Sequence, residues 1–187
     1  MNSKRVFALL AFLFPIMTYV LYVQAILSGG AHPTISSWIS WGVMDFAILS
    51  AMIAARSIAW QMVAYTIGTA VIIGVSLLKG VTVGWSNLDS VCIVVVIVAI
   101  ILWIISGKPS VAVIFSIVAA VIGSVPNIVN VWHNPTNEPL LPWLLITVGS
   151  VFGVAAIKKW DTVGALTPIA FLVLQVAFVL LISFQFF

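Results

Sequence analysis

Seven apolar runs separated by short polar turns fill almost all of this 187-residue chain. A helix that crosses the hydrocarbon core of a bilayer needs about 20 mostly apolar residues. Cutting the chain at charges, Gly, Pro and Asn gives runs 6–27, 37–55, 59–78, 90–105, 111–131, 141–157 and 163–186. The turns leave no room for a soluble domain. The sequence therefore predicts an all-α integral membrane protein with seven transmembrane helices.

The composition excludes a soluble fold. Hydrophobic residues make up 64% of the chain and charged residues 6%, whereas a soluble domain carries about 25% charged residues. The net charge of +3 is scattered over short turns, so we expect no nucleic-acid partner. The single cysteine, Cys92, lies in an apolar run, and we interpret it as a packing residue.

The basic residues predict the orientation. If seven helices alternate in direction, Lys79 falls on one side and all the other basic residues fall on the opposite side: Lys4, Arg5, Arg56, Lys108, Lys158 and Lys159. Cytoplasmic turns are enriched in Lys and Arg. We therefore expect a plasma (inner) membrane protein with a cytoplasmic N-terminus and a C-terminus outside. The first run is too long for the apolar region of a signal peptide.

Tryptophans lie near the ends of the predicted helices. Aromatic residues of this kind are typical of the membrane–water interface. On this basis we expect an interfacial belt formed by Trp60, Trp103 and Trp160 inside, and by Trp38, Trp85, Trp132 and Trp143 outside.

The chain contains a weak internal repeat. A shift of 105 residues places Trp38 on Trp143, Leu21 on Pro126 and Asp45 on Ser150. This shift predicts a 3+1+3 plan, with a first triplet at 1–79, a linker helix at 80–109 and a second triplet at 110–187. An odd linker gives both triplets the same orientation, so an axis along the membrane normal relates them in a parallel repeat.

About 20 residues of the second triplet carry a resemblance to a known family. The stretch 126–132 (PNIVNVW), the polar break 134–139 and the helix start Leu141-Pro142-Trp143 resemble the SWEET, or PQ-loop (MtN3-like), superfamily of small seven-helix transporters. The first triplet has Leu21-Tyr22 where the motif has Pro-Gln. Members usually place the N-terminus outside, and the inverted orientation here is nearer to the nicotinamide-riboside type of vitamin transporter.

Asp45 lies near the middle of the second run, at the depth of the bilayer centre. A charge there costs about 2.5–3.5 kcal/mol on insertion scales, so this carboxyl must face the interior, be paired or be protonated. Trp38 and Trp41 share its helix face, with Trp38 about 10 Å away. The three side chains predict a route for a cation or a flat ring. Alternatively, Asp45 is neutral and bonded to Ser or Thr, Trp38 is interfacial and Trp41 packs.

Other polar residues are candidates for the same pocket. Asn127 and Asn130 flank Pro126, which removes a backbone hydrogen bond, and they are interpreted either as a solute site beside a hinge or as interhelical contacts. Tyr65 and Thr69 form a polar strip on the third run. The resemblance implies that the third helix of each triplet lines the pocket, so that Thr69 faces Gln175. Alternatively, Gln175 only makes a hydrogen bond between helices.

These residues predict a carrier that moves a small polar or cationic solute, sugar- or vitamin-like, by alternating access. Asp45 binds a cation or couples a proton in this scheme, and Pro126, Pro15 and Pro168 act as hinges. The alternative is a non-transporting receptor or assembly factor of the PQ-loop type. We expect no enzyme, cofactor or metal site, because the sequence contains none of the usual catalytic or metal-binding motifs. The expected partners are membrane lipid and the solute. The Gly149/Gly153 pair also suggests a face for a homodimer.

Overall fold

The computed structural model describes residues 3–184. They form one short 3₁₀ turn and seven α-helices, close to the predicted runs. The elements are α1 (Ser3–Leu27), α2 (Ile35–Ala54), α3 (Trp60–Lys79), α4 (Asn87–Ser106), α5 (Pro109–His133), η1 (Pro135–Asn137), α6 (Leu140–Ala155) and α7 (Thr162–Ser183). The predicted end of the last run, at 186, lies outside the described residues.

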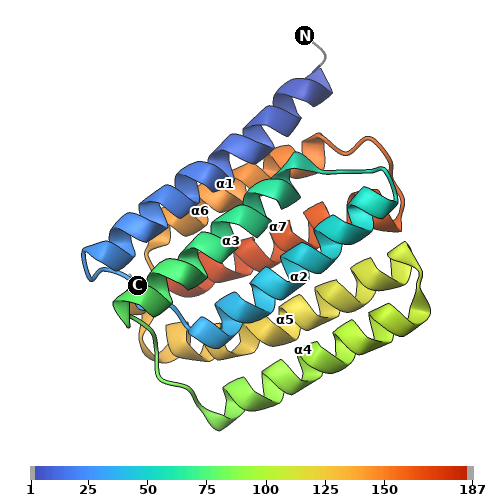
Figure 1. The fold of residues 1–187 in the computed structure, drawn as a ribbon. Helices are drawn as coiled ribbons and strands as arrows, with labels where there is room; N and C mark the ends of the chain where they lie inside the picture. The colour runs from blue at the N-terminus through green and yellow to red at the C-terminus, as the bar shows by residue number, and fades with distance from the viewer. Residues whose placement is uncertain (1–2, 185–187) are drawn as a thin grey trace.

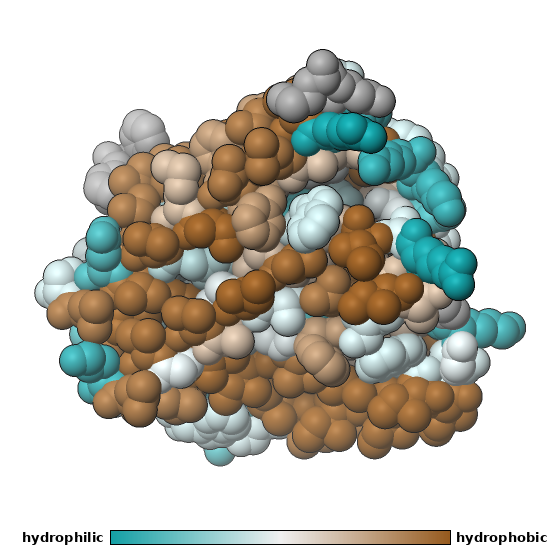
Figure 2. Space-filling model, turned by 45° about the horizontal axis from the view of Figure 1, so that its top comes forward, coloured by the Kyte–Doolittle hydropathy of each residue, from teal (hydrophilic) through white to brown (hydrophobic). Residues whose placement is uncertain are grey.

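Six of these seven described helices are long and apolar enough to cross a membrane. The exception is α6, which has 16 residues because Pro139 precedes it and the Lys158-Lys159 turn follows. Hydrophobic residues cover much of the face seen in Figure 2, and hydrophilic residues gather toward its two ends. The chain is an all-α integral membrane protein, as its composition predicts.

Helix α4 is longer than the predicted run 90–105, and its ends explain why. Ser86 and Asp89 form a capping box, in which each side chain accepts from the other residue's backbone N–H. Capping residues belong to a helix start although they are polar, so cutting the run at Asp89 removed the first turn. Gly107 ends the helix in the left-handed conformation, with φ of 62°.

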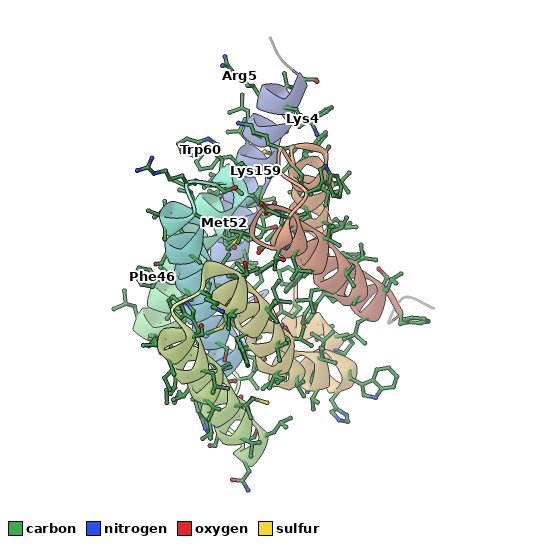
Figure 3. All side chains as sticks on the ribbon, turned by 90° about the vertical axis from the view of Figure 1, so that its right-hand side faces the viewer. Lys4, Arg5, Phe46, Met52, Trp60 and Lys159 are labelled. Atoms are coloured by element: carbon green, nitrogen blue, oxygen red, sulfur yellow. The ribbon has the colours of Figure 1, made fainter. Side chains whose placement is uncertain are left out.

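The helices alternate in direction, and the N-terminal end of α1 and the C-terminal end of α7 lie at opposite ends of the bundle (Figure 1). Lys4, Arg5 and Lys159 lie at the same end (Figure 3). Helix α3 packs against both α1 and α2, and α7 packs against both α5 and α6. Helix α1 also packs on α6, and α2 on α5, while α4 lies at the edge against α5.

Gly149 and Gly153 of α6 pack against other helices of the same chain. A Cβ at Gly149 would lie 2.8 Å from Pro15 Cδ of α1, and one at Gly153 would overlap the Gln61 side chain of α3. Small residues let helices approach closely. The face that the GxxxG spacing suggested for a second copy is therefore occupied by α1 and α3.

Candidate functional site

A cavity of about 60 Å³ lies between the helices at the depth of Asp45, which is near the middle of α2. Every helix except α4 contributes to its wall. The lining residues are Tyr19, Trp38, Trp41, Asp45, Tyr65, Thr69, Ser124, Trp143, Ile146, Phe171, Leu174, Gln175 and Phe178. The volume is several times the 10–15 Å³ or so that one water needs, and smaller than the roughly 300–1,000 Å³ of a drug-sized site.

Asp45 is 2% exposed and its carboxyl group is held on one side only. Thr69 Oγ1 donates to Asp45 Oδ2 at 3.0 Å, and the Tyr19 hydroxyl lies 3.3 Å from Thr69 Oγ1. Because the Thr69 proton goes to Asp45, Tyr19 is the donor to Thr69. Asp45 Oδ1 has no hydrogen-bond partner. No Lys, Arg or His is among the described residues that line the cavity.

Aromatic rings make up much of the remaining wall. The Trp41 ring lies 5.2 Å from that of Trp38, 6.0 Å from that of Trp143 and 5.8 Å from that of Phe178, each edge to face. Trp143 and Phe178 stack at 4.4 Å. Trp41 Nε1 donates to Ser124 Oγ at 2.9 Å, which fixes this ring in place. The arrangement offers ring faces and edges to a bound molecule.

A hydrogen-bonded network lies beside the cavity toward the Lys4 end. Gln61 Nε2 donates to Tyr65 Oη at 2.7 Å and to Ser150 Oγ at 2.8 Å. Gln175 Nε2 also donates to Tyr65 Oη, at 2.8 Å, and its Oε1 accepts from Ser150. These four residues join α3, α6 and α7. We call them the inner network.

A second cavity, of about 200 Å³, lies at the Lys4 end of the bundle. Gln61 lines it, so the inner network lies between this cavity and the one at Asp45. Arg56, Lys158 and Lys159 are in its wall. Its wall therefore carries positive charge, and we call this second cavity the basic vestibule.

Glu138 is a buried acidic residue at the opposite end of the bundle. It lies in the turn between η1 and α6, outside the membrane-spanning helices, and is 2% exposed. Its Oε2 accepts from Tyr22 Oη of α1 at 2.8 Å and from Trp143 Nε1 of α6 at 2.9 Å. Burial raises the Glu138 pKa to about 7, although these bonds and Asn127 oppose the rise. A carboxyl group that changes charge near neutral pH thus bridges α1 and α6.

Asn127 and Asn130 belong to the Glu138 end of the bundle and do not line the Asp45 cavity. The Asn127 backbone N, next to Pro126, donates to Ser37 Oγ at 3.1 Å, and its Oδ1 accepts from Thr34 at 2.9 Å. Asn130 Oδ1 accepts from Asn137 at 2.9 Å. The polar groups beside Pro126 therefore hold α5 to α2 and to its own following turn.

The other six predicted solute residues line the cavity together: Trp38, Trp41, Asp45, Tyr65, Thr69 and Gln175. Thr69 and Gln175 bond different helices and not each other: Thr69 bonds Asp45 of α2, and Gln175 bonds Ser150 of α6. The hinge candidates Pro15, Pro126 and Pro168 lie inside α1, α5 and α7; a bending role stays a prediction.

Two tryptophans expected in the interfacial belt are instead buried. Trp38 is 5% and Trp143 8% exposed, because both pack into the cavity wall. Trp143 was not predicted as a site residue, and neither were Tyr19 and Ser124. The repeat could have found Trp143, since it lies 105 positions after the predicted Trp38. Tyr19 and Ser124 also lie 105 positions apart, but neither was a candidate from which the other could be inferred.

Comparison of the chain with family models, with curated proteins and with solved structures found no match. Within the described residues, no group of three or more His, Cys, Asp and Glu side chains is placed to hold a metal ion. The chemistry of the site is therefore argued from its own geometry.

Proposed function

We propose that this protein is a carrier that moves a small polar or cationic solute across the membrane through the Asp45 cavity. The observation that carries the proposal is this cavity between six helices. It contains the buried carboxyl group of Asp45, of which one oxygen has no hydrogen-bond partner. An ionisable residue inside a membrane bundle that faces a cavity is typical of a solute or proton pathway.

The packing supports a 3+1+3 parallel repeat as the moving framework. In each proposed triplet the third helix contacts the other two, and the first helix of each triplet contacts the second helix of the other. Exchanging the triplets leaves this set of neighbours unchanged. The cavity wall follows the same rule, since residues 19 and 124, 38 and 143, and 41 and 146 line it in pairs 105 positions apart.

The two ends of the bundle supply the barriers that alternating access requires. The inner network separates the Asp45 cavity from the basic vestibule, and Glu138 ties α1 to α6 at the other end. Rocking of the triplets would break these contacts in turn. In the proposed topology α6 also crosses the inner membrane, the Lys4 end is cytoplasmic, and Pro15, Pro126 and Pro168 absorb the bending.

Cysteine labelling tests the proposal without knowledge of the solute. Leu174 lines the cavity and makes no side-chain hydrogen bond, so Leu174→Cys in a Cys92→Ala background places one thiol there. A membrane-impermeant maleimide is then applied to each face of proteoliposomes. Val94→Cys, at a position exposed on the lipid side of α4, is the control and should react from neither face.

A carrier predicts that the thiol at 174 reacts from both faces. Reaction from one face alone would instead identify a receptor, the competing function, in which a ligand enters and leaves on the same side. No reaction from either face would overturn both functions.

A further inference from the structure

The Asp45 cavity has one strong acceptor without a partner. Thr69 satisfies Oδ2 and leaves Oδ1 unbonded at a residue that is 2% exposed. Trp38 Nε1 also lacks a partner, and the backbone of Trp38 lies two turns from Asp45, about 10 Å along α2. A molecule bound beside Asp45 is therefore required to donate a hydrogen bond, since an unmet buried acceptor costs about 1–3 kcal/mol.

The neighbouring hydroxyl groups donate toward Asp45, and none of them carries a positive charge. Tyr19 donates to Thr69 and Thr69 donates to Asp45, so both hydroxyl protons point toward the carboxylate. The described lining residues include no Lys, Arg or His. A buried charge is stabilised only when it is paired. When this carboxyl is ionised, a bound cation would supply the positive charge that no described lining residue provides.

The rest of the wall suits an organic cation better than an inorganic one. Trp38, Trp41, Trp143 and Phe178 surround the space with π-systems, which attract cations by their ring faces. Small metal ions such as Mg²⁺ and Ca²⁺ take six or more oxygen ligands. The other side-chain oxygens among the described lining residues already take part in hydrogen bonds within the protein; they belong to Thr69, Tyr19, Tyr65, Ser124 and Gln175.

We propose that the cavity selects a small organic cation that bears N–H donors, an alkylammonium or amidinium ion. Its N–H group donates to Asp45 Oδ1 and its carbon atoms contact the rings of Trp41 and Trp143. The volume of about 60 Å³ admits only a few non-hydrogen atoms in this conformation. The inference rests on the proposed function, because it takes this cavity to be the solute site.

Acetamidinium and acetamide test the proposal as a matched pair, because they have nearly the same shape and differ in charge. Binding to the purified full chain is measured by tryptophan fluorescence and by thermal unfolding, since a ligand of the folded state raises the unfolding midpoint. Dimethylammonium, tetramethylammonium and potassium chloride complete the panel at constant ionic strength. Tetramethylammonium has the charge but no N–H donor.

We expect acetamidinium and dimethylammonium to bind about tenfold or more tightly than acetamide, tetramethylammonium and potassium. Asp45→Asn should abolish this preference, and Phe178→Leu should weaken binding several-fold. Phe46→Leu is the control, because Phe46 follows Asp45 in α2 yet is 65% exposed on the outer flank (Figure 3). That variant should bind as the wild type does.

Three results would overturn the inference in the wild-type protein, whether or not the variants fold. Acetamide binding as tightly as acetamidinium would show a neutral site. Potassium competing equally would show an inorganic cation site. Absence of binding by every organic cation would exclude the class. None of these results depends on labelling at 174, so the carrier proposal and the cation proposal can fail separately.

Discussion

At the scale of single residues, the site combines satisfied and unsatisfied polar groups. In the inner network, none of the described buried polar side-chain atoms lacks a hydrogen-bond partner. Asp45, by contrast, retains one free oxygen. Fully satisfied buried networks are rigid, and a partly satisfied group is where a ligand or water gains most. The contrast separates a structural role for Ser150 from a binding role for Asp45.

Replacing Asp45 by Asn should abolish transport while leaving the protein folded. The amide oxygen still accepts from Thr69, so the packing persists, but the negative charge is lost. We expect uptake into proteoliposomes, measured with a solute that the wild type accumulates, to fall by about tenfold or more. Size-exclusion chromatography should show an unchanged peak. A wild-type rate across pH 5 to 8 would refute the role of Asp45 in binding or coupling.

Replacing Glu138 by Gln should remove a pH dependence of stability. The Glu138 pKa rises from its ordinary 4.5 to about 7 on folding, so between these values the unfolded chain has lost a proton that the folded chain keeps. Stability therefore falls as the pH rises through this window and is constant above it. We expect the unfolding midpoint of the wild type to drop by several degrees from pH 5 to pH 7.5 or so.

In the Glu138→Gln variant the new amide oxygen still accepts from Tyr22 and Trp143, so this variant should show a nearly flat midpoint over the same range. The ionisable side chains of His32 and His133 are exposed in the turns at the same end of the bundle. The double variant His32→Gln and His133→Gln is therefore the control and should retain the slope. An equal slope in wild type and Glu138→Gln would contradict the assignment.

At the scale of helices, close contact is made by glycines that the apolar runs do not distinguish. Gly68 of α3 faces the ring of Tyr19 on α1 so closely that a Cβ would overlap it. Gly74, on the same helix, has nothing within 4 Å of that position. One glycine is required by packing and the other is not.

Gly68→Ala should destabilise the protein, because the buried Tyr19 ring must move and its bond to Thr69 is disturbed. Overpacking of this kind costs about 1–3 kcal/mol, and the midpoint of thermal unfolding should fall by several degrees. Gly74→Ala is the matched control in the same helix and should not lower the midpoint. Equal midpoints for the two variants would show that α1 and α3 adjust freely.

At the scale of the whole molecule, the bundle has a basic end and a cavity on its axis. Turns with Arg56, Lys108 and Lys158 lie at the Lys4 end because the helices alternate. Under the positive-inside rule this end would be cytoplasmic, which is the topology that we propose. Six of the described helices are long enough to cross a membrane, and α6 is shorter. The number of crossings is therefore seven if α6 crosses and six if it does not.

Labelling of intact cells should reveal this topology. In a Cys92→Ala background, an impermeant maleimide should reach Thr136→Cys directly. It should reach Ser110→Cys and Trp160→Cys only after the membrane is permeabilised. All three positions are exposed, so reactivity reports the side of the membrane. Positions 136 and 160 flank α6, and labelling of both without permeabilisation would show that α6 does not cross.

The sequence by itself determined the class of fold and the buried position of Asp45. Long apolar runs have no stable alternative to membrane helices, and a lone carboxyl at mid-depth is too costly to face lipid. These conclusions depend only on composition along the chain. Helix ends were less certain, because capping residues such as Asp89 are polar and resemble turns.

Tertiary structure decided which polar and aromatic residues meet. The local sequence does not distinguish a tryptophan that faces lipid from one that faces a cavity. The burial of Trp143 therefore followed only from the packing of α6. Glu138 resembles a solvated turn residue until Tyr22, 116 positions earlier, donates to it. Contacts between distant segments set burial and hydrogen bonding, and no local pattern encodes them. That is why the cavity, its unbonded carboxyl oxygen and the hydrogen-bonded groups on either side of it emerged only when the helices were assembled.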